Sequence, residues 1–331
     1  MKDPAFTDLV DLAAERLGGA VLLANDEFFA PKESLLRAAS PVWKEHEYTD
    51  RGKWMDGWET RRRRTPGHDW CLIRLGLPGL VRGVVVDTAF FRGNHPEHCE
   101  LEGCAVEGVP DAAALDADAS VRRHVLLPRT PLAGDTRNAF EVRSNERVTH
   151  VWLRIHPDGG VARLRVHGEV RPAPAVLAPG RSLDLAAMEH GGFVVACSDM
   201  FFGHRQNLIL PGRSTHMGDG WETRRRRGSG HDWAIVRLAA RGELERVELD
   251  TDHFKGNAPA SCSLEYCEAP RVAGAELADS RAWRPLLGDS PLQPHARHAW
   301  DLPARATATH VRLNIFPDGG VARLRLLGRV A

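Results

Sequence analysis

The sequence predicts an all-β protein: a tandem repeat of two antiparallel jelly-roll β-sandwich domains. Three observations predict this class: a long internal repeat, a dominant hydrophobic period of two, and short apolar runs separated by turns rich in Gly, Pro and Asp. A chain of 331 residues is long enough for two domains that each bury a core. The 44 basic and 44 acidic residues balance, so no global field attracts nucleic acid.

Two blocks carry the repeat. Residues 56–70 and 219–233 share thirteen of fifteen positions, DGWETRRRR followed after two residues by GHDW, at an offset of 163. The block PDGGVARLR occurs unchanged at 157–165 and 317–325, at an offset of 160. Blocks this long, in the same order twice, indicate two homologous domains.

The domain boundaries follow from the repeat and from one Pro-rich stretch. We expect a first jelly-roll repeat with a short N-terminal helix over 1–170 and a second repeat over 181–331. Three prolines within 171–180 predict a stiff, extended linker. The change in offset along the chain places ten extra residues of the first half between Phe29 and Asp56.

Alternation of apolar and polar residues predicts the strands. Residues 148–156 and 309–316 alternate in this way, as half-buried strands do. A tight turn is expected at 157–160, followed by a returning strand over 161–166. The other predicted elements are strands over 70–75 and 81–91 and helices over 5–17 and 183–189.

The four consecutive arginines of each DGWETRRRR block are candidate ligand contacts. On a strand, Arg61 and Arg63 would share a face with Glu59, and a guanidinium group suits a carboxylate or a ureido oxygen. Structural salt bridges to Glu59 and nearby acids are the alternative interpretation. The candidate substrate-binding residues are Arg61, Arg63, Arg224 and Arg226, with Asn94 and Asn257 from a Gly-Asn turn that both halves contain.

The GHDW part of each block places an imidazole beside a carboxylate at a turn before a strand. Histidine transfers protons near neutral pH, and a carboxylate can fix its tautomer. A purely structural turn, with Asp capping backbone amides and Trp in the core, explains the pattern equally well. The candidate catalytic residues are His68, Asp69, Glu59, His231, Asp232 and Glu222. Phe90 in the first half corresponds to His253 in the second, so the halves can differ catalytically.

The six cysteines are predicted to be buried, reduced thiols. Cys99 and Cys104, like Cys262 and Cys267, are five residues apart, which puts the members of each pair on opposite strand faces. This spacing suits neither a local disulfide nor a zinc knuckle. No cofactor is predicted, and a divalent metal stays open because the sixteen histidines show no diagnostic spacing. Without an apolar leader or a membrane-length apolar run, we expect a cytoplasmic protein with no membrane partner.

The doubled motifs resemble those of the allantoicase family (allantoate amidinohydrolases). The resemblance rests on DGWETRRRR with GHDW, on DTAFFRGN and DTDHFKGN at 87–94 and 250–257, and on PDGGVARLR, and it covers nearly the full chain. The two halves depart from each other just before the PDGGVARLR block, where the first has His156 and the second has Phe316.

The resemblance implies two jelly-roll sandwiches, a homo-oligomeric enzyme, and hydrolysis of the small molecule allantoate to ureidoglycolate and urea. It assigns no catalytic residue, so the site residues above come from the sequence pattern alone. A non-catalytic tandem jelly roll that binds a sugar or a small anionic ligand is the alternative, because a fold by itself does not determine function. Release of urea from allantoate distinguishes the two.

Overall fold

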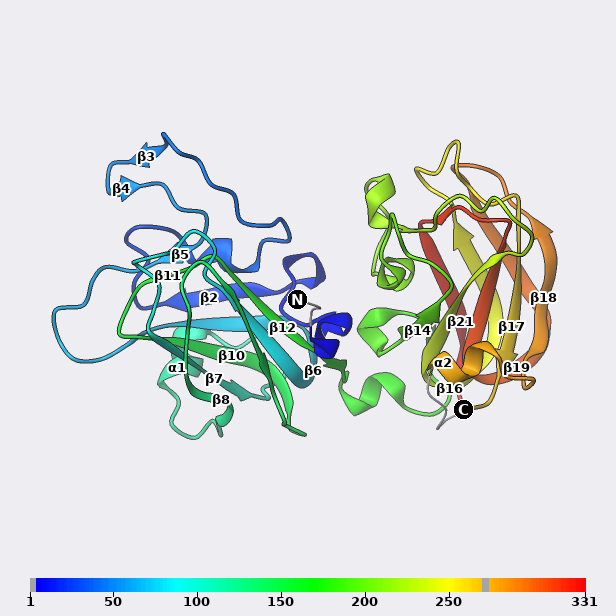
Figure 1. The fold of residues 1–331 in the computed structure, drawn as a ribbon. Helices are drawn as coiled ribbons and strands as arrows, with labels where there is room; N and C mark the ends of the chain where they lie inside the picture. Colours follow the sequence, from blue (N-terminus) through cyan, green and yellow to red (C-terminus); the bar gives the residue numbers. More distant parts are fainter. Residues whose placement is uncertain (1–3, 270–273) are drawn as a thin grey trace. The chain divides into compact units, whose positions relative to one another are not determined.

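The computed structural model describes residues 4–269 and 274–331 and divides into two compact units, Met1–Arg171 and Pro172–Ala331. Each unit is an antiparallel β-sandwich with one short α-helix, which confirms the predicted fold class (Figure 1).

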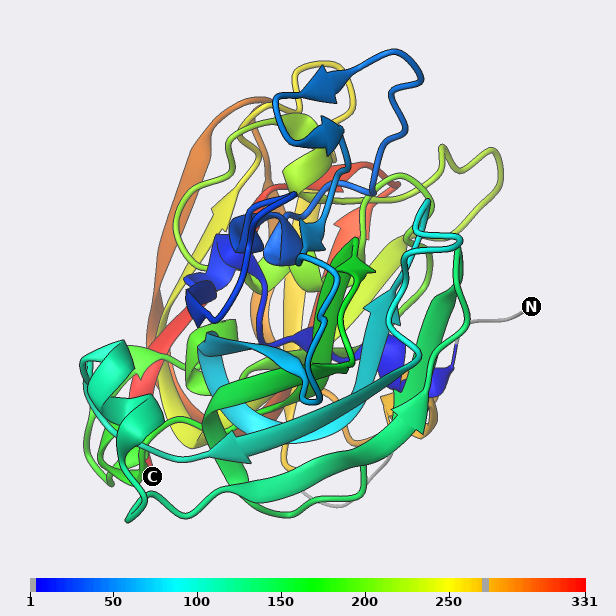
Figure 2. The ribbon, with the colours of Figure 1, turned by 90° about the vertical axis from the view of Figure 1, so that its left-hand side faces the viewer.

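The first unit is organised around one 19-residue strand, β6, in a continuous eight-stranded sheet that supplies both layers of the sandwich. The first part of β6 pairs with β2 and β10, and its second part pairs with β12 and β9. The strand curves strongly between these parts, and it is the cyan ribbon at the lower centre of Figure 2. The elements are η1 (Ala5–Asp8), β1 (Val10–Asp11), η2 (Glu15–Leu17), β2 (Ala20–Ala24), η3 (Lys32–Leu36), β3 (Tyr48–Thr49), β4 (Gly52–Lys53), β5 (Trp58–Glu59), β6 (Asp69–Asp87), β7 (His98–Cys104), α1 (Ala112–Ala117), β8 (His124–Pro131), β9 (Arg137–Glu141), β10 (Arg147–His156), β11 (Gly160–Val161) and β12 (Arg163–Val170).

The second unit repeats this pairing around β16, with β19 taking the places of both β9 and β10. The ten extra residues of the first half contain the hairpin β3–β4, which stands away from the sandwich in Figure 1. The elements of the second unit are η4 (Pro174–Leu177), β13 (Ser182–Asp184), η5 (Met188–His190), β14 (Phe193–Cys197), η6 (Arg205–Ile209), η7 (Met217–Asp219), β15 (Trp221–Glu222), β16 (Asp232–Asp250), β17 (Ser261–Cys267), α2 (Gly274–Ala278), β18 (Arg284–Pro291), β19 (Arg297–Phe316), β20 (Gly320–Val321) and β21 (Arg323–Val330).

The predicted helices over 5–17 and 183–189 are wrong. Both segments contain short 3₁₀ turns and a strand of two or three residues. Asp11 explains the difference, because its carboxylate accepts hydrogen bonds from the backbone N–H groups of Ala13 and Val166. These bonds tie the segment to strand β12 instead of leaving it to helical hydrogen bonding. The predicted extended linker likewise contains one 3₁₀ turn, Pro174–Leu177.

The predicted strands over 70–75 and 81–91 are a single strand up to Asp87, and the turn at 157–160 does not close a hairpin. Strand β10 before this turn pairs with one part of β6, and β12 after it pairs with the other, so the chain crosses from one side of β6 to the other. Strand β11, at the end of the turn, pairs with β5. This crossing brings the PDGG segment against the DGWET segment.

All six cysteines are free thiols, and all but Cys197 are buried. Cys104 packs with Leu72, Trp152 and the helix residue Leu115 on the α1-covered face of its sheet. Burial raises the pKa of the buried thiols, which keeps them protonated and unreactive.

A buried histidine should make the stability of the second repeat depend on pH. His310 is 4% exposed, and burial, with Arg237 nearby, lowers its pKa to about 4. As the pH falls, His310 therefore takes up a proton near pH 6.5 in the unfolded chain but only near pH 4 in the folded chain. The contribution of neutral His310 to the free energy of unfolding is complete above pH 6.5 and is lost as the pH falls below it. Between pH 7.5 and pH 5, the free energy of unfolding measured in urea should fall by about 2 kcal/mol more in the parent than in His310→Gln. Equal losses in both would contradict this assignment.

Candidate active site

The two sequence blocks meet at one end of each sandwich. In the first repeat, Trp58 and Glu59 pair with the strand that follows the PDGG turn, and the backbone N–H of Thr60 donates to the Gly159 carbonyl oxygen at 3.1 Å. Trp58 is fully buried, so the next residue, Glu59, turns the other way. The close pairing requires glycine at 160, where a Cβ atom would lie 2.0 Å from the ring of Phe91.

Glu59 and Asn94 are brought together, as are Glu222 and Asn257. The Asn94 side-chain amide donates to Glu59 Oε1 at 2.8 Å, and that of Asn257 to Glu222 Oε1 at 2.6 Å. In the part of the chain that the structure describes, neither glutamate forms an ion pair. Burial raises the pKa of Glu59, and the hydrogen bond from neutral Asn94 opposes this only in part. Such a carboxyl group can hold a proton closer to neutral pH than an ordinary glutamate.

The arginines do not lie on a strand, which corrects the sequence prediction. The strand ends at Glu59, and the chain continues as a loop until Asp69. Arg61 donates through its backbone N–H and Nε to Asp26 at 2.9 and 2.7 Å. The backbone N–H of Arg63 donates to Asp158 at 2.8 Å, and its Nη1 to Asp69 at 2.6 Å.

The second repeat has the same arrangement. Arg224 donates to Asp199, the backbone N–H of Arg226 donates to Asp318, and the Arg226 side chain pairs with Asp232. Salt bridges to nearby acids are therefore present in both repeats, but their partners are aspartates rather than Glu59 or Glu222. Each of these guanidinium groups still has N–H groups left for a ligand.

His68 and Asp69 do not form the hydrogen-bonded pair that the sequence left open. Asp69 is 2% exposed, and its Oδ1 accepts from Arg63 and from the Asn25 amide, which lies 2.8 Å away. The His68 ring instead lies 5.0 Å, centroid to centroid, from the ring of His156.

In the second repeat the corresponding groups are also separate. Asp232 pairs with Arg226 and accepts from the Ser198 hydroxyl, while His231 Nε2 lies 3.2 Å from Asn314 Oδ1. Asp69 and Asp232 thus orient an arginine rather than an imidazole.

The sequence prediction missed several residues that complete the site. Asp158 and Asp318 lie in the repeated PDGG turns. Asp26 and Asp199 occupy corresponding places in a further match between the halves, residues 10–30 against 183–203, at an offset of 173. Recurrence in both halves was the available signal. Their partnership with the arginines was not visible, because Arg63 and Asp158 are 95 residues apart.

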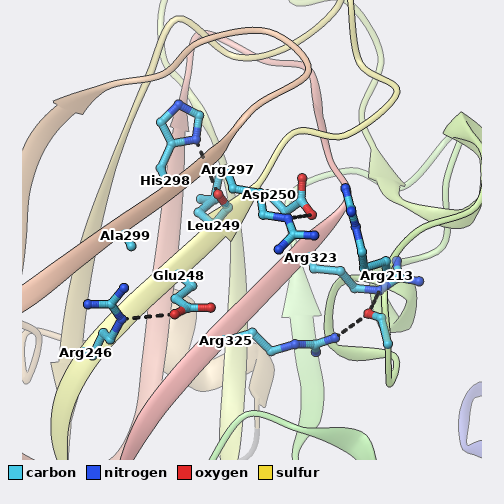
Figure 3. A pocket seen from close by; sticks show the side chains of 11 residues that line it. Arg213, Arg246, Glu248, Leu249, Asp250, Arg297, His298, Ala299, Arg323 and Arg325 are labelled. Carbon is cyan, nitrogen blue, oxygen red and sulfur yellow. Dashed lines mark hydrogen bonds and ion pairs between the residues drawn. The ribbon is translucent and has the colours of Figure 1, made fainter.

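A cavity of about 320 Å³ on the second repeat is also rich in arginine (Figure 3). It lies on β16, β19 and β21, and every guanidinium group in its lining has a protein partner. Arg213 pairs with Asp252, and Arg325 donates to the carbonyl oxygens of Leu210 and Gly212. The remaining three, Arg246, Arg297 and Arg323, pair with Glu248 and Asp301, with Asp250 and with Asp219 respectively. We therefore read these arginines as structural groups that hold loops against the sheet.

The described residues contain neither a cluster of metal ligands nor a helix of membrane-spanning character. Among residues 4–269 and 274–331, no three His, Cys, Asp or Glu side chains are grouped so that they could hold a metal ion. Over the same ranges, no helix is long and apolar enough to cross a membrane.

Comparison with known proteins decides the family. The family model described as the allantoicase repeat matches residues 10–171 and, a second time, residues 183–331. The chain belongs to the allantoicase family. This confirms the resemblance of the sequence motifs, and the two matches correspond to the two sandwiches.

Relatives and solved structures of the allantoicase family match over nearly the whole chain. A probable allantoicase of Pseudomonas aeruginosa is 48% identical over 332 residues, which covers 99% of this chain and 98% of the relative. The allantoicase of Dictyostelium discoideum is 44% identical over 323 residues, covering 97% and 87%. The crystal structure of allantoicase from Saccharomyces cerevisiae superposes with a TM-score of 0.78 at 34% identity, covering 96% of this chain and 92% of that one.

Proposed function

We propose that this chain hydrolyses allantoate to ureidoglycolate and urea, one of the steps of purine degradation. The observation that carries the proposal is its full-length similarity, at 44–49% identity, to proteins named allantoicase or probable allantoicase. The geometry supports it, because each repeat holds a carboxyl group with a neutral partner beside arginines that aspartates fix in place.

The reaction needs a proton donor and an activated water. Allantoate has one carboxylate and two ureido groups on a single carbon, so urea leaves when the C–N bond breaks and its nitrogen gains a proton. Glu59, with its raised pKa, is the group we assign to donate that proton. A water molecule adds its hydroxide to the carbon, and its remaining proton passes to an imidazole, for which we assign His68. Glu222 and His231 occupy the same positions in the second repeat.

The arginines supply the site for the substrate carboxylate. Asp26 holds Arg61, and Asp69 and Asp158 hold Arg63, so the remaining N–H groups are oriented before the substrate arrives. Arg224 and Arg226 are held in the same way in the second repeat. Asn94 and Asn257, predicted to bind substrate, instead act in this scheme by positioning Glu59 and Glu222.

We further propose a homo-oligomeric cytoplasmic enzyme with allantoate as its small-molecule partner and no nucleic-acid or membrane partner. Six free thiols support a reducing compartment, and the zero net charge argues against a nucleic-acid partner.

Release of urea from allantoate by the purified chain tests the proposal. Arg61→Ala, checked for native folding, should raise KM, lower kcat, or both, by roughly 2–4 kcal/mol in transition-state terms, because it removes a charge-assisted contact, and Arg224→Ala measures the same contact in the second repeat. The exposed Arg143→Ala is the matched control and should behave as the parent. Binding of allantoate without release of urea would favour the non-catalytic binding module instead. Parent rates in both folded variants would show that the arginines are structural.

A further inference from the structure

The two repeats surround their common histidine with different residues. In the first repeat, the antiparallel strands β7 and β10 place Glu100 opposite Arg154, two residues before His156. His156 Nε2 lies 3.5 Å from Glu100 Oε2, and the His156 ring lies 5.0 Å from the ring of His68. His68, His156 and Glu100 therefore lie in one continuous row.

The row is anchored at its far end. Arg154 donates to Glu100 at 2.8 Å and pairs with Glu102 at 2.7 Å, so the Glu100 carboxylate has a fixed place. His156 is 9% exposed, and its Nε2 has no hydrogen-bond partner within the described residues. An imidazole nitrogen that is buried without a hydrogen bond lowers the stability of the fold, so its presence calls for a functional explanation.

The second repeat lacks this row. Phe316 takes the place of His156 and packs its ring 4.8 Å from the ring of His231. Ser263 takes the place of Glu100, and Asn314 takes the place of Arg154. Asn314 Oδ1 lies 3.2 Å from His231 Nε2. Neither the amide of Asn314 nor the phenyl ring of Phe316 accepts a proton near neutral pH.

The charges around the row keep both imidazoles neutral, the form that accepts a proton. Burial, then Arg154, lowers the pKa of His68, with Arg63 adding to this and Glu100 and Asp69 opposing it. Burial, then Arg129 on strand β8, lowers the pKa of His156, and Glu100 opposes this. Burial by itself raises the pKa of Glu100, but Arg154 outweighs it and keeps the group a carboxylate.

We infer that His156 and Glu100 form a proton relay behind His68, and that only the first repeat can use it. The inference rests on the proposed function. A proton that His68 takes from the attacking water passes to His156, where the Glu100 carboxylate stabilises the imidazolium, and it returns by the same route. In each transfer an N–H bond breaks at one ring as another forms at the next, so no further reactant is needed. His156 is thus a positioning and relay residue, and the repeats are unequal in proton transfer.

Matched single substitutions in the two repeats test the inference. His156→Phe gives the first repeat the residue of the second, and Phe316→Leu is the matched change in the second repeat. We expect His156→Phe to lower kcat about 10–100-fold with little change in KM and to alter the pH profile of kcat, because proton transfer and not binding is affected. Phe316→Leu should leave both unchanged. His68→Gln should lower kcat far more than His231→Gln.

Histidine titration by NMR provides a readout that does not depend on turnover. In the parent, His68 and His156 should titrate as a coupled pair, and in His156→Phe His68 should titrate in one independent step. Glu100→Gln should lower the pKa of both imidazoles, because it removes the charge that favours their protonated forms.

Independent titration in the parent, or a folded His156→Phe with the parent kcat and pH profile, would overturn the relay. Equal losses in His68→Gln and His231→Gln would overturn the asymmetry. A parent that releases no urea but shows coupled titration would refute the proposed function and not the relay geometry.

Discussion

Replacing Glu59 by glutamine is expected to lower kcat for urea release by about 10²–10⁴-fold, the usual contribution of a well-placed general acid. Glutamine has almost the same shape and keeps an oxygen for the Asn94 amide, which lies 2.8 Å from Glu59 in the parent, so the fold should not change. What the variant loses is the proton that the leaving nitrogen of urea requires.

The pH dependence provides a second measurement on the same variant. Burial raises the pKa of Glu59, and a general acid works only while it is protonated. Activity of the parent should therefore fall as pH rises through this raised pKa, and the corresponding limb of the kcat profile should be absent from Glu59→Gln.

Two further variants serve as controls for Glu59. Glu146→Gln changes an exposed carboxyl group outside the site and should keep the parent kcat. Glu222→Gln changes the matched residue of the second repeat, and the proton relay of the first repeat predicts a smaller loss there. A folded Glu59→Gln with parent activity would remove Glu59 from the chemistry.

Arg163→Ala is expected to destabilise the protein by about 3–5 kcal/mol, because it removes one partner of a buried ion pair. Arg163 is 2% exposed, and its Nη2 donates to Asp56 Oδ2 at 2.8 Å. Its other N–H groups donate to the carbonyl oxygens of Asp56 and Ala39. Burial by itself raises the pKa of Asp56, but the hydrogen bonds from Arg163 and from the Val42 backbone N–H, together with the charges of Arg163 and Arg37, hold that pKa below its usual range.

Equilibrium unfolding in guanidinium chloride measures this loss. The exposed Arg143→Ala is the control and should change the free energy of unfolding by no more than about 0.5 kcal/mol. Adding Asp56→Asn to Arg163→Ala should recover part of the loss, because the uncompensated charge then disappears. A loss under about 1 kcal/mol for Arg163→Ala would mean that the Arg163–Asp56 pair does not hold the start of the DGWET segment.

The sequence by itself determined the family and the fold class, and it predicted a candidate site in both repeats. Two blocks repeated almost without change reveal duplication directly, and a hydrophobic period of two is a local property of each strand. The position of the ten-residue insertion also followed from the sequence, and the hairpin β3–β4 lies within it. These features depend only on the order of residues along the chain.

Tertiary structure alone decided which groups act together. Arg61 contacts Asp26, 35 residues away in the sequence. Arg63 contacts Asp158, 95 residues away, because the turn at 157–160 links strands on the two sides of β6 and lies against the DGWET segment. The strand prediction failed for the arginines because their charged side chains leave the sheet directly after Glu59. The neighbours His68 and Asp69 separate for a related reason: Asp69 begins strand β6 and turns inward to Arg63, whereas His68 lies against a ring from strand β10. His68 lies in the loop just before the strand that Asp69 begins, so the two neighbours in the sequence point to different partners, which only the tertiary structure brings to them.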